Sequence, residues 1–177
     1  MPKKKTPCPF KVLVYNLKMT INEFTAKKLG EVLAFTRVST DTITKGHSAL
    51  VQVLGEEKVQ DMLDKNRIHG EEVIRISTDA GAIDITLQKA EKTEAKLQKM
   101  RDDYVGDEWD NPTELLEWGG FFEGAAIVHF ALVRGIAESL NDEGFLMLAQ
   151  EGVNYHYEIL DLIESELGSL GQNRATL

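Results

Sequence analysis

The placement of proline is the feature that most constrains the fold of this chain. Four prolines occur, at positions 2, 7, 9 and 112, so none interrupts the stretch from Phe10 to Asn111. Proline breaks a helix interior because it lacks the backbone N–H and clashes with the preceding turn. Long helices are therefore permitted here, and apolar residues at helical spacing predict that they form.

The spacing of apolar residues predicts two helices in the first half of the chain. The first covers about residues 20–54, with Gly46 as a candidate break. The second begins at Gly55, and two alternatives stay open: it bends at Gly81, or it continues to about residue 104. Its inward stripe holds both apolar and polar side chains, namely Val59, Met62, Leu63, Asn66, His69, Val73 and Ile76.

Two further helices are predicted in the second half. Asn111 is a good N-cap and Pro112 suits the first helical position, so a third helix should start there and reach about residue 140. A fourth should span about residues 142–167, with Gly168 as its stop.

The predicted helices form an all-α four-helix bundle: two helical hairpins joined by a long crossover. The charged segment 88–101 is expected to be an exposed helix held by i,i+4 ion pairs, or else the crossover between the two halves. One domain should cover residues 20–170, between a flexible basic tail (1–19) and a frayed tail (171–177). A strand at Lys11–Leu17 is the weaker alternative, because it has no partner strand.

Composition limits the partners and the compartment. The net charge of −9 argues against nucleic acid or an anionic membrane as the main partner. The single cysteine, Cys8, cannot form an internal disulfide. No uninterrupted apolar run approaches the roughly 18 residues of a membrane span, and the start of the chain lacks a secretory signal pattern. We therefore expect a cytoplasmic protein.

The two halves of the chain look alike when Glu31 is aligned with Glu123. Each half has a glutamate within its first helix and a histidine, His69 or His156, on its second. The fourth-helix residues 148–151 and 156–160, Leu-Ala-Gln-Glu and His-Tyr-Glu-Ile-Leu, resemble the last helix of rubrerythrin-type members of the ferritin-like superfamily. The resemblance covers about residues 20–168 in architecture, but only short pieces in sequence.

The resemblance implies a di-iron or di-manganese centre. Members of the superfamily use one glutamate from each of two helices and a Glu-x-x-His pair from each of the other two. Carried over by residue, Glu31 and Glu123 match the single glutamates and His69 matches one histidine. Three residues before His69, where the family has glutamate, this chain has Asn66.

The fourth helix departs from the family pattern as well. The residue three before His156 is Val153. When the helices are aligned instead on Leu-Ala at 148–149, the expected glutamate falls on Gly152 and the expected histidine on Tyr155. Both bridging carboxylates are therefore missing from the pattern.

Helical spacing independently places four potential ligands on apolar faces. Residues at i, i+3, i+4 and i+7 share a face, so Glu31 and Glu123 are expected to face the core together with His69 and His156. Two carboxylates and two imidazoles can bind zinc, iron or manganese. Further candidates are Glu72 and Glu151 as extra oxygen ligands, and Asn66 as a neutral ligand or a hydrogen-bond partner of one.

Other polar residues are expected to lie outside this set. His129 should face a neighbouring helix or solvent, about 120° from Glu123 on the same helix. Helical spacing places Arg134 close to the face of the helix that carries Glu123, and Arg134 is therefore expected to be the counter-charge of Glu123. His47, beside the candidate break, should be a surface residue.

Two functional hypotheses follow. The first is a ferritin-like protein that binds one or two divalent ions of iron, manganese or zinc, with metal-handling or metal-dependent oxidoreductase activity. The second is a metal-free, non-enzymatic bundle whose Glu–His pairs are hydrogen-bonded, and which acts as an oligomeric or protein-interaction module. Self-association is expected in either case, because the adjacent Phe121 and Phe122 cannot both face one core. A homodimer is the simplest form, and another protein partner stays open.

Overall fold

The computed structural model describes residues 20–175, and this part of the chain is helical apart from its connections. Six helices follow one another: α1 (Glu23–Lys45), α2 (His47–Leu54), α3 (Glu56–Asp79), α4 (Ile83–Val105), α5 (Pro112–Leu140) and α6 (Glu143–Ala175). No strand occurs between residues 20 and 175, so the predicted all-α class is confirmed. The tail 1–19, with its alternative strand at Lys11–Leu17, lies outside the described residues.

Three glycines separate the helices in the first half of the chain, and Gly55, with a φ of 80°, lies between α2 and α3. At Gly46 the chain passes from α1 to α2, as the sequence predicted. At Gly81 the backbone adopts a φ of 70°, a left-handed conformation that glycine reaches without steric cost. The chain reverses there, so α3 and α4 are separate helices rather than one long helix.

The predicted start of the third helix is confirmed. The side-chain oxygen of Asn111 accepts a hydrogen bond from the backbone N–H of Thr113 at 3.1 Å, and Pro112 is the first residue of α5. The cap satisfies a backbone donor that the first turn leaves without a partner. The helix ends at residue 140, also as predicted.

The predicted end of the fourth helix at Gly168 is wrong, because α6 continues to Ala175. A glycine inside a helix costs only about 1 kcal/mol relative to alanine. Leu167 and Leu170 pack against one of the hydrophobic core clusters, which keeps the helix in register beyond the glycine. Residues 171–175 of the predicted frayed tail therefore belong to α6.

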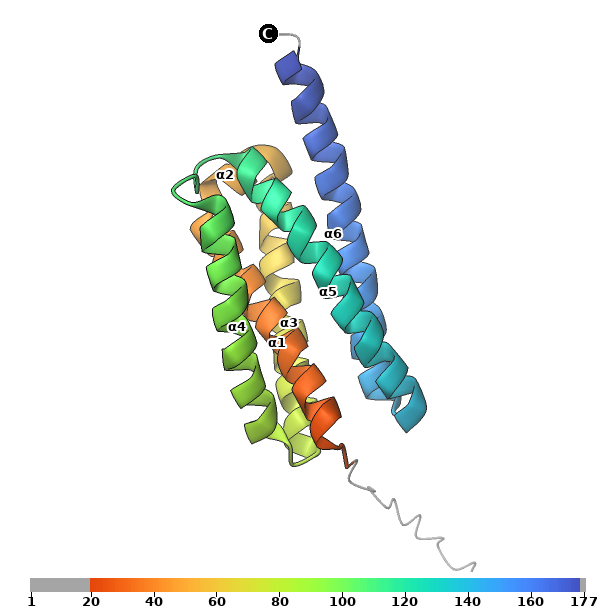
Figure 1. Cartoon of the computed structure of the whole chain (residues 1–177). Coiled ribbons are helices and arrows are strands. Elements are labelled where there is room, and N and C mark those ends of the chain that lie inside the picture. The colour runs from red at the N-terminus through yellow and green to blue at the C-terminus, as the bar shows by residue number, and fades with distance from the viewer. Residues whose placement is uncertain (1–19, 176–177) are drawn as a thin grey trace, which may run out of the picture.

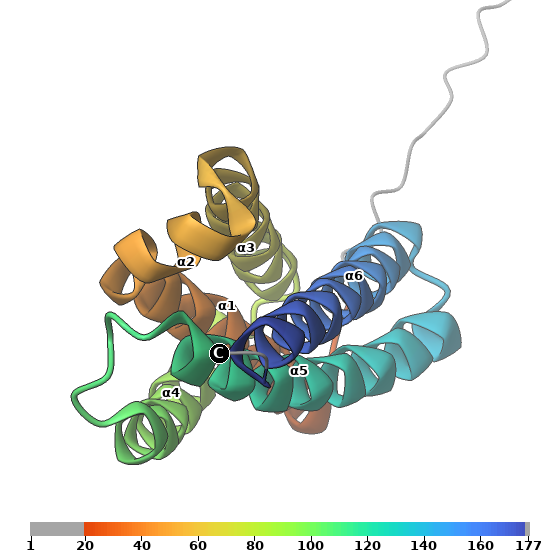
Figure 2. The ribbon, with the colours of Figure 1, turned by 90° about the horizontal axis from the view of Figure 1, so that it is seen from above.

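Helix α1 occupies the middle of the molecule and packs against α3, α4 and α5. Seen from above, α3, α4 and α5 surround α1, and α6 lies beside α5 (Figure 2). The antiparallel helices α5 and α6 form a hairpin with extensive mutual packing (Figure 1). A smaller contact between α3 and α6 closes the core on the remaining side.

Helix α4 contains a buried arginine that the sequence did not reveal. Arg101 is 1% exposed, and its Nη1 lies 2.5 Å from the carboxylate of Asp41 on α1. Its guanidinium carbon lies 5.1 Å from the centre of the Trp109 ring. Elsewhere in the segment, Lys99 forms an exposed i,i+4 pair with Asp103. Lys89 and Glu94 instead pair with Glu31 and Arg37 of α1, so part of the segment is held by another helix rather than by pairs within α4. Arg101 thus ties α4 to α1.

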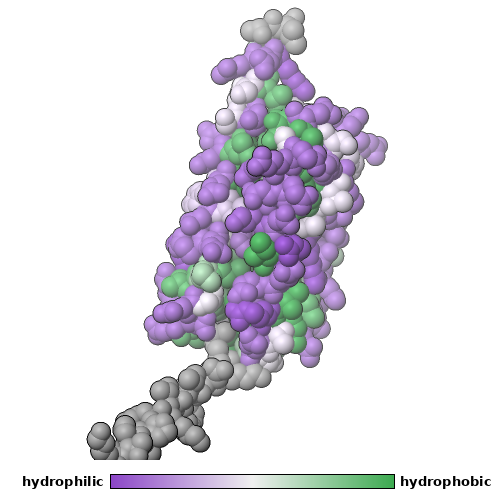
Figure 3. Space-filling view, turned by 180° about the vertical axis from the view of Figure 1, so that it is seen from behind, coloured by the Kyte–Doolittle hydropathy of each residue, from purple (hydrophilic) through white to green (hydrophobic). Residues whose placement is uncertain are grey.

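By length and composition, α5 is the described helix that could cross a membrane, although the apolar core helix of a globular protein meets the same criterion. In the space-filling view from behind, the surface is mostly hydrophilic, with hydrophobic residues in separate patches (Figure 3).

Candidate functional site

Glu123 on α5 and His156 on α6 form the central contact of the candidate site. Nδ1 of His156 and Oε2 of Glu123 are hydrogen-bonded, and the two side chains are 0% and 5% exposed. A carboxylate removed from water needs such a partner. The second ring nitrogen of His156, Nε2, is buried and has no hydrogen-bond partner among residues 20–175. His156 therefore keeps one ring nitrogen free inside the core.

Gly152 allows an aromatic ring to approach this histidine. A Cβ atom added at Gly152 would lie 2.1 Å from Cδ1 of Phe130, so any larger residue would displace that ring. The ring centre of Phe130 lies 5.0 Å from that of His156 and 5.8 Å from that of His69. Phe130 therefore contacts both histidines that the sequence proposed as ligands.

Asn66 on α3 and Tyr155 on α6 connect their helices through neutral groups. The amide nitrogen of Asn66 donates to Oγ of Ser39 at 2.9 Å and lies 3.3 Å from the hydroxyl of Tyr155. The ring of Tyr155 packs against His69 and His156, with centre distances of 5.5 and 5.0 Å. The ring of Tyr155 thus joins the two histidines by aromatic packing, and hydrogen bonds tie Tyr155 to Asn66 and Asn66 to Ser39. These linking groups carry no charge.

Burial shifts the pKa values of two members of this cluster. It lowers the pKa of His69 from 6.5 to about 4, and positive charge on His156 and Lys65 acts in the same direction. It raises the pKa of Tyr155 well above 10, and the negative charge of Glu123 adds to the increase. Nδ1 of His69 has no hydrogen-bond partner in the described part of the chain, so no acceptor offsets the cost of charging the ring. Both side chains are uncharged at neutral pH.

Glu31 belongs to a different cluster, formed by α1, α4 and α5. Its carboxylate lies 2.8 Å from Nζ of Lys28, 2.9 Å from Nζ of Lys89 and 3.2 Å from Nδ1 of His129. Burial acts to raise the pKa of Glu31, but the hydrogen bonds and charges of the two lysines outweigh it, and the net pKa is lowered. This carboxylate is therefore compensated by its own neighbours.

The structure does not assemble the proposed ligands into one donor set. Glu123 and His156 are paired, His69 lies near them, and Glu31 is held by lysines. Between residues 20 and 175, no group of three or more histidine, cysteine, aspartate or glutamate side chains is placed to hold a metal ion. Of the further candidates, Asn66 lies in the neutral network, Glu72 pairs with Arg75, and Glu151 is exposed.

The positions at which the resemblance expects ligands carry neutral groups that contact one another. The space next to Gly152, where a carboxylate is expected, is filled by the ring of Phe130. Asn66, where the other bridging carboxylate is expected, is in hydrogen-bond contact with Tyr155, where a histidine is expected. The amide of Asn66, the phenol of Tyr155 and the ring of Phe130 supply neither the carboxylate oxygens nor the imidazole nitrogens that hold iron or manganese in such centres. The ligand set of the family therefore does not fit these positions.

A cavity adjoins Glu123, but it is too small for an organic substrate. Its volume is about 40 Å³, and its walls include Ser39, Met62, Phe122 and Ile159. Such a space suits about one water molecule, whereas pockets for organic ligands usually measure several hundred Å³. The Glu123–His156 pair therefore has no room beside it for a substrate of ordinary size.

The sequence did not indicate the partners that Arg134 and His129, two polar residues of α5, have in the structure. Arg134 is not the counter-charge of Glu123; it lies 3.4 Å from Gln150 and 3.8 Å from Glu138. Arg134 follows Glu123 by eleven residues, which is about three helical turns. Over that length a small deviation from the ideal rotation of about 100° per residue turns the side chain of Arg134 away from the inner face. His129 does face a neighbouring helix, but nothing in a single sequence indicated that its partner there is Glu31.

No family model, curated protein or solved structure matches the chain. The contacts of the site form a neutral, hydrogen-bonded and aromatic core around one carboxylate–histidine pair.

Replacing Glu123 by alanine should lower the free energy of unfolding by about 2–4 kcal/mol, because Nδ1 of His156 then loses its partner inside the core. Chemical denaturation at neutral pH measures the change. Glu138→Ala on the same helix is the matched control, since its exposed pair with Arg134 should contribute about 0.5 kcal/mol or less. Equal losses in the two variants would contradict the assigned role of Glu123.

Acid should destabilise the protein through His69. The unfolded chain binds a proton near pH 6.5 and the folded chain only near pH 4, so stability falls as the pH drops through this window. Between pH 7 and pH 5 the loss from this residue should be roughly 2 kcal/mol, measured by denaturation at each pH. His69→Gln should remove that part of the pH dependence. An unchanged pH profile in the variant would show that His69 titrates normally.

Proposed function

We propose that the chain is a metal-free, non-enzymatic protein of ferritin-like architecture that acts by associating with a second copy of itself. In this arrangement α1 and α3 form one hairpin of the bundle and α5 and α6 form the other, while α1 packs more extensively on α4 than on α3. Helix α4 lies between the two hairpins in sequence and runs alongside α1, which suits the long crossover between the two halves. Its direction returns the chain from one end of the molecule to the other (Figure 1).

The metal-free part of the proposal is supported by what occupies the expected ligand positions. Phe130 fills the space beside Gly152, and the Asn66–Tyr155 contact stands where a carboxylate and a histidine are expected. Glu123 already has His156 as its partner. The cluster is partly satisfied, because Nε2 of His156, Nδ1 of His69 and Oδ1 of Asn66 have no hydrogen-bond partner among the described residues. Its buried Glu123–His156 pair can fix the register of the helices without a cation.

The observation that carries the proposed function is an exposed, uncharged stripe along α5. Phe121, Val128 and Leu132 are 71%, 68% and 42% exposed, and Ala125 lies exposed between them. The spacing i, i+4, i+7 and i+11 puts these four residues on one face of the helix. Phe122, next to the first of them, is buried, in agreement with the argument that adjacent phenylalanines cannot share one core.

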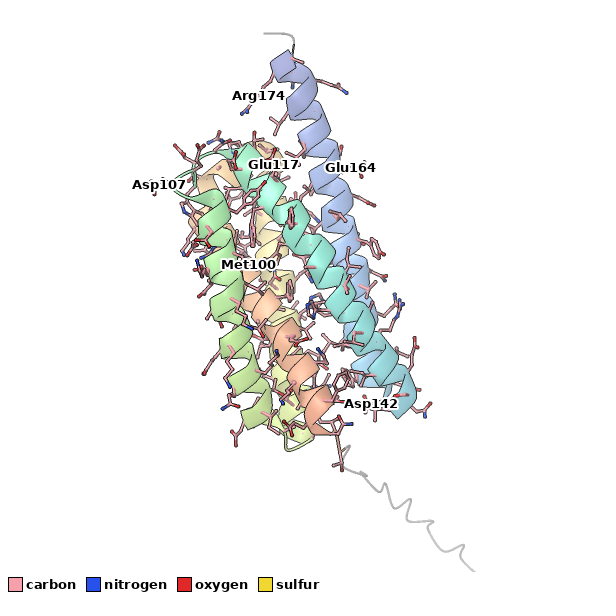
Figure 4. All side chains as sticks on the ribbon, in the orientation of Figure 1. Met100, Asp107, Glu117, Asp142, Glu164 and Arg174 are labelled. Atoms are coloured by element: carbon pink, nitrogen blue, oxygen red, sulfur yellow. The ribbon has the colours of Figure 1, made fainter. Side chains whose placement is uncertain are left out.

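Helix α4 extends this surface. Met100 and Tyr104 line a shallow pocket with Phe121, and the ring centres of Tyr104 and Phe121 lie 6.3 Å apart. Met100 and Glu117 are labelled in Figure 4, at the α4 and α5 sides of this region. Asp103 and Trp118 also line the pocket, and the hydroxyl of Tyr104 donates to Glu117, so charged residues edge the apolar side chains. An apolar centre with a polar edge is typical of protein interfaces, and a stable dimer buries about 800 Å² per partner.

A second copy of the chain is the occupant that charge and symmetry favour. Two copies that each carry a net charge of −9 repel one another, and the repulsion is smallest when they meet through an uncharged surface. The stripe is symmetric about its midpoint, since Phe121 and Leu132 are equally far from it, as are Ala125 and Val128. Two antiparallel α5 helices related by a two-fold axis would therefore pack Phe121 against Leu132 of the partner subunit.

Val128→Glu should weaken self-association at least about tenfold, because the two-fold axis places two new carboxylates in one apolar interface. Light scattering at micromolar concentration should show the mass fall from two copies to one. Val128 is largely exposed, so the helix content, measured by circular dichroism, should not change. Tyr157→Glu on α6 is the matched control, since that side chain is 52% exposed and outside the stripe.

A wild-type protein that is monomeric at micromolar concentration would refute the proposed function. Equal dissociation by Val128→Glu and Tyr157→Glu would also contradict it, because the effect would then not belong to the α5 stripe.

The second candidate function retains the metal. It is favoured by one observation: Glu123 fixes Nδ1 of His156 and leaves Nε2 free, which is how carboxylates orient metal-binding histidines. His69 also has an unpartnered Nδ1 among the described atoms. Two histidines with an amide oxygen from Asn66 form a poor site for iron or manganese, so this candidate ranks second.

A further inference from the structure

The small cavity beside Glu123 has hydrogen-bonding groups among its mostly apolar walls. Three of its lining residues carry side-chain oxygen atoms, namely Ser39 and Thr42 on α1 and Glu123 on α5. All three are buried, with exposed fractions of 5%, 9% and 3%. The other walls are mainly apolar side chains, such as Leu50 on α2 and Ile159 on α6. An occupant of this cavity would therefore be shielded from solvent and within reach of polar groups.

Ser39 has a hydroxyl hydrogen that its own helix does not use. Thr36, Thr40 and Thr42, also on α1, each donate to a backbone oxygen three or four residues earlier. Ser39 makes no such bond with any described residue, and its oxygen instead accepts from the side-chain nitrogen of Asn66 at 2.9 Å. Between residues 20 and 175, the hydrogen of this buried hydroxyl thus has no acceptor. A buried donor of this kind is unfavourable unless it finds a partner.

Glu123 has the complementary requirement. Its Oε2 is hydrogen-bonded to Nδ1 of His156, whereas Oε1 has no hydrogen-bond partner in the described part of the chain. An ionised carboxylate accepts several hydrogen bonds, so a second donor would stabilise it. No direct hydrogen bond joins Ser39 to Glu123 among the described residues, although both line the same cavity. The cavity therefore lies between an unused donor and an unused acceptor.

The size and polarity of the cavity suit a water molecule. Its volume is about 40 Å³, and a water needs at least about 10–15 Å³ of such space. Purely apolar cavities stay dry, whereas a buried water makes about three hydrogen bonds to polar groups that otherwise lack partners. Oγ1 of Thr42 supplies a third group, because it accepts from Arg101 and keeps a second lone pair. Three oxygen atoms are too few for a hard cation, which takes about six oxygen ligands.

We propose that a water molecule is bound in this cavity and bridges Ser39 to Glu123. It accepts the hydroxyl hydrogen of Ser39 and donates its own hydrogens to Oε1 of Glu123 and Oγ1 of Thr42. A single chain of hydrogen bonds then runs from Asn66 through Ser39 and the water to Glu123 and His156. This chain joins α3, α1, α5 and α6 inside the core. The inference rests on the metal-free core of the proposed function.

Relaxation dispersion of the oxygen-17 nuclei of water tests the proposal in the full chain after treatment with a chelator. The method counts water molecules that remain inside the protein for longer than it takes to tumble. Ser39→Val removes the hydroxyl and fills part of the cavity, so the count should fall by about one water per chain. Thr40→Val is the matched control, because Thr40 lies outside the cavity lining and donates to its own helix. Its count should equal that of the wild type, and circular dichroism should show unchanged helix content in both variants.

Nuclear Overhauser effects between water and methyl groups provide a second measurement, which needs no variant. The methyl groups of Met62 and Ile159 line the cavity and should show contacts with water. Val32 is 0% exposed, belongs to the other core cluster and should show none.

Equal water counts in the wild type and Ser39→Val would overturn the proposal, as would the absence of water contacts at both Met62 and Ile159. A metal ion that survives the chelator is detected separately, by elemental analysis. It would refute the metal-free core, and this inference with it. Loss of the bridging water alone would leave the metal-free core intact.

Discussion

The hydrogen bond between Glu123 and His156 is the interaction on which the rest of the core depends. It compensates a carboxylate that is buried among the helices, and it joins the two longest helices, α5 and α6. The groups packed around it are neutral. Burial holds His69 uncharged, Asn66 and Tyr155 interact as neutral groups, and Phe130 occupies the space that Gly152 leaves. The other buried charges follow the same rule, since Glu31 has two lysines and Arg101 has Asp41.

Much of the fold could be predicted because it depends on local signals. Neighbouring residues alone determine three of its features: the start of α5 at Asn111–Pro112, the break at Gly46, and the opposite exposure of Phe121 and Phe122. The pairing of Glu123 with His156 could also be predicted, because both residues lie on apolar helix faces that point to the core.

What could not be predicted depends on contacts between helices that are distant in sequence. Glu31 has the correct spacing for an inward residue, but its direction is set by Lys89 on α4 and His129 on α5. Arg101 looked like part of a solvated charged run, yet it is buried against Asp41. Gly168 favours the end of an isolated helix, but Leu167 and Leu170 pack on a core cluster, and this packing stabilises α6 beyond the glycine.

Helix α5 buries the ionisable Glu123 among otherwise apolar residues and exposes the uncharged Phe121, Val128 and Leu132. We infer that the inner face of α5 fixes the register of the helices within one chain, and that the outer face binds a second copy of the chain. Metal content tests the central claim about the inner face most directly. After incubation of the purified, untagged chain with iron, manganese or zinc and removal of excess ion, elemental analysis should find well under one equivalent per chain. About one or two equivalents, lost in His69→Ala/His156→Ala, would contradict the account and restore the metal centre.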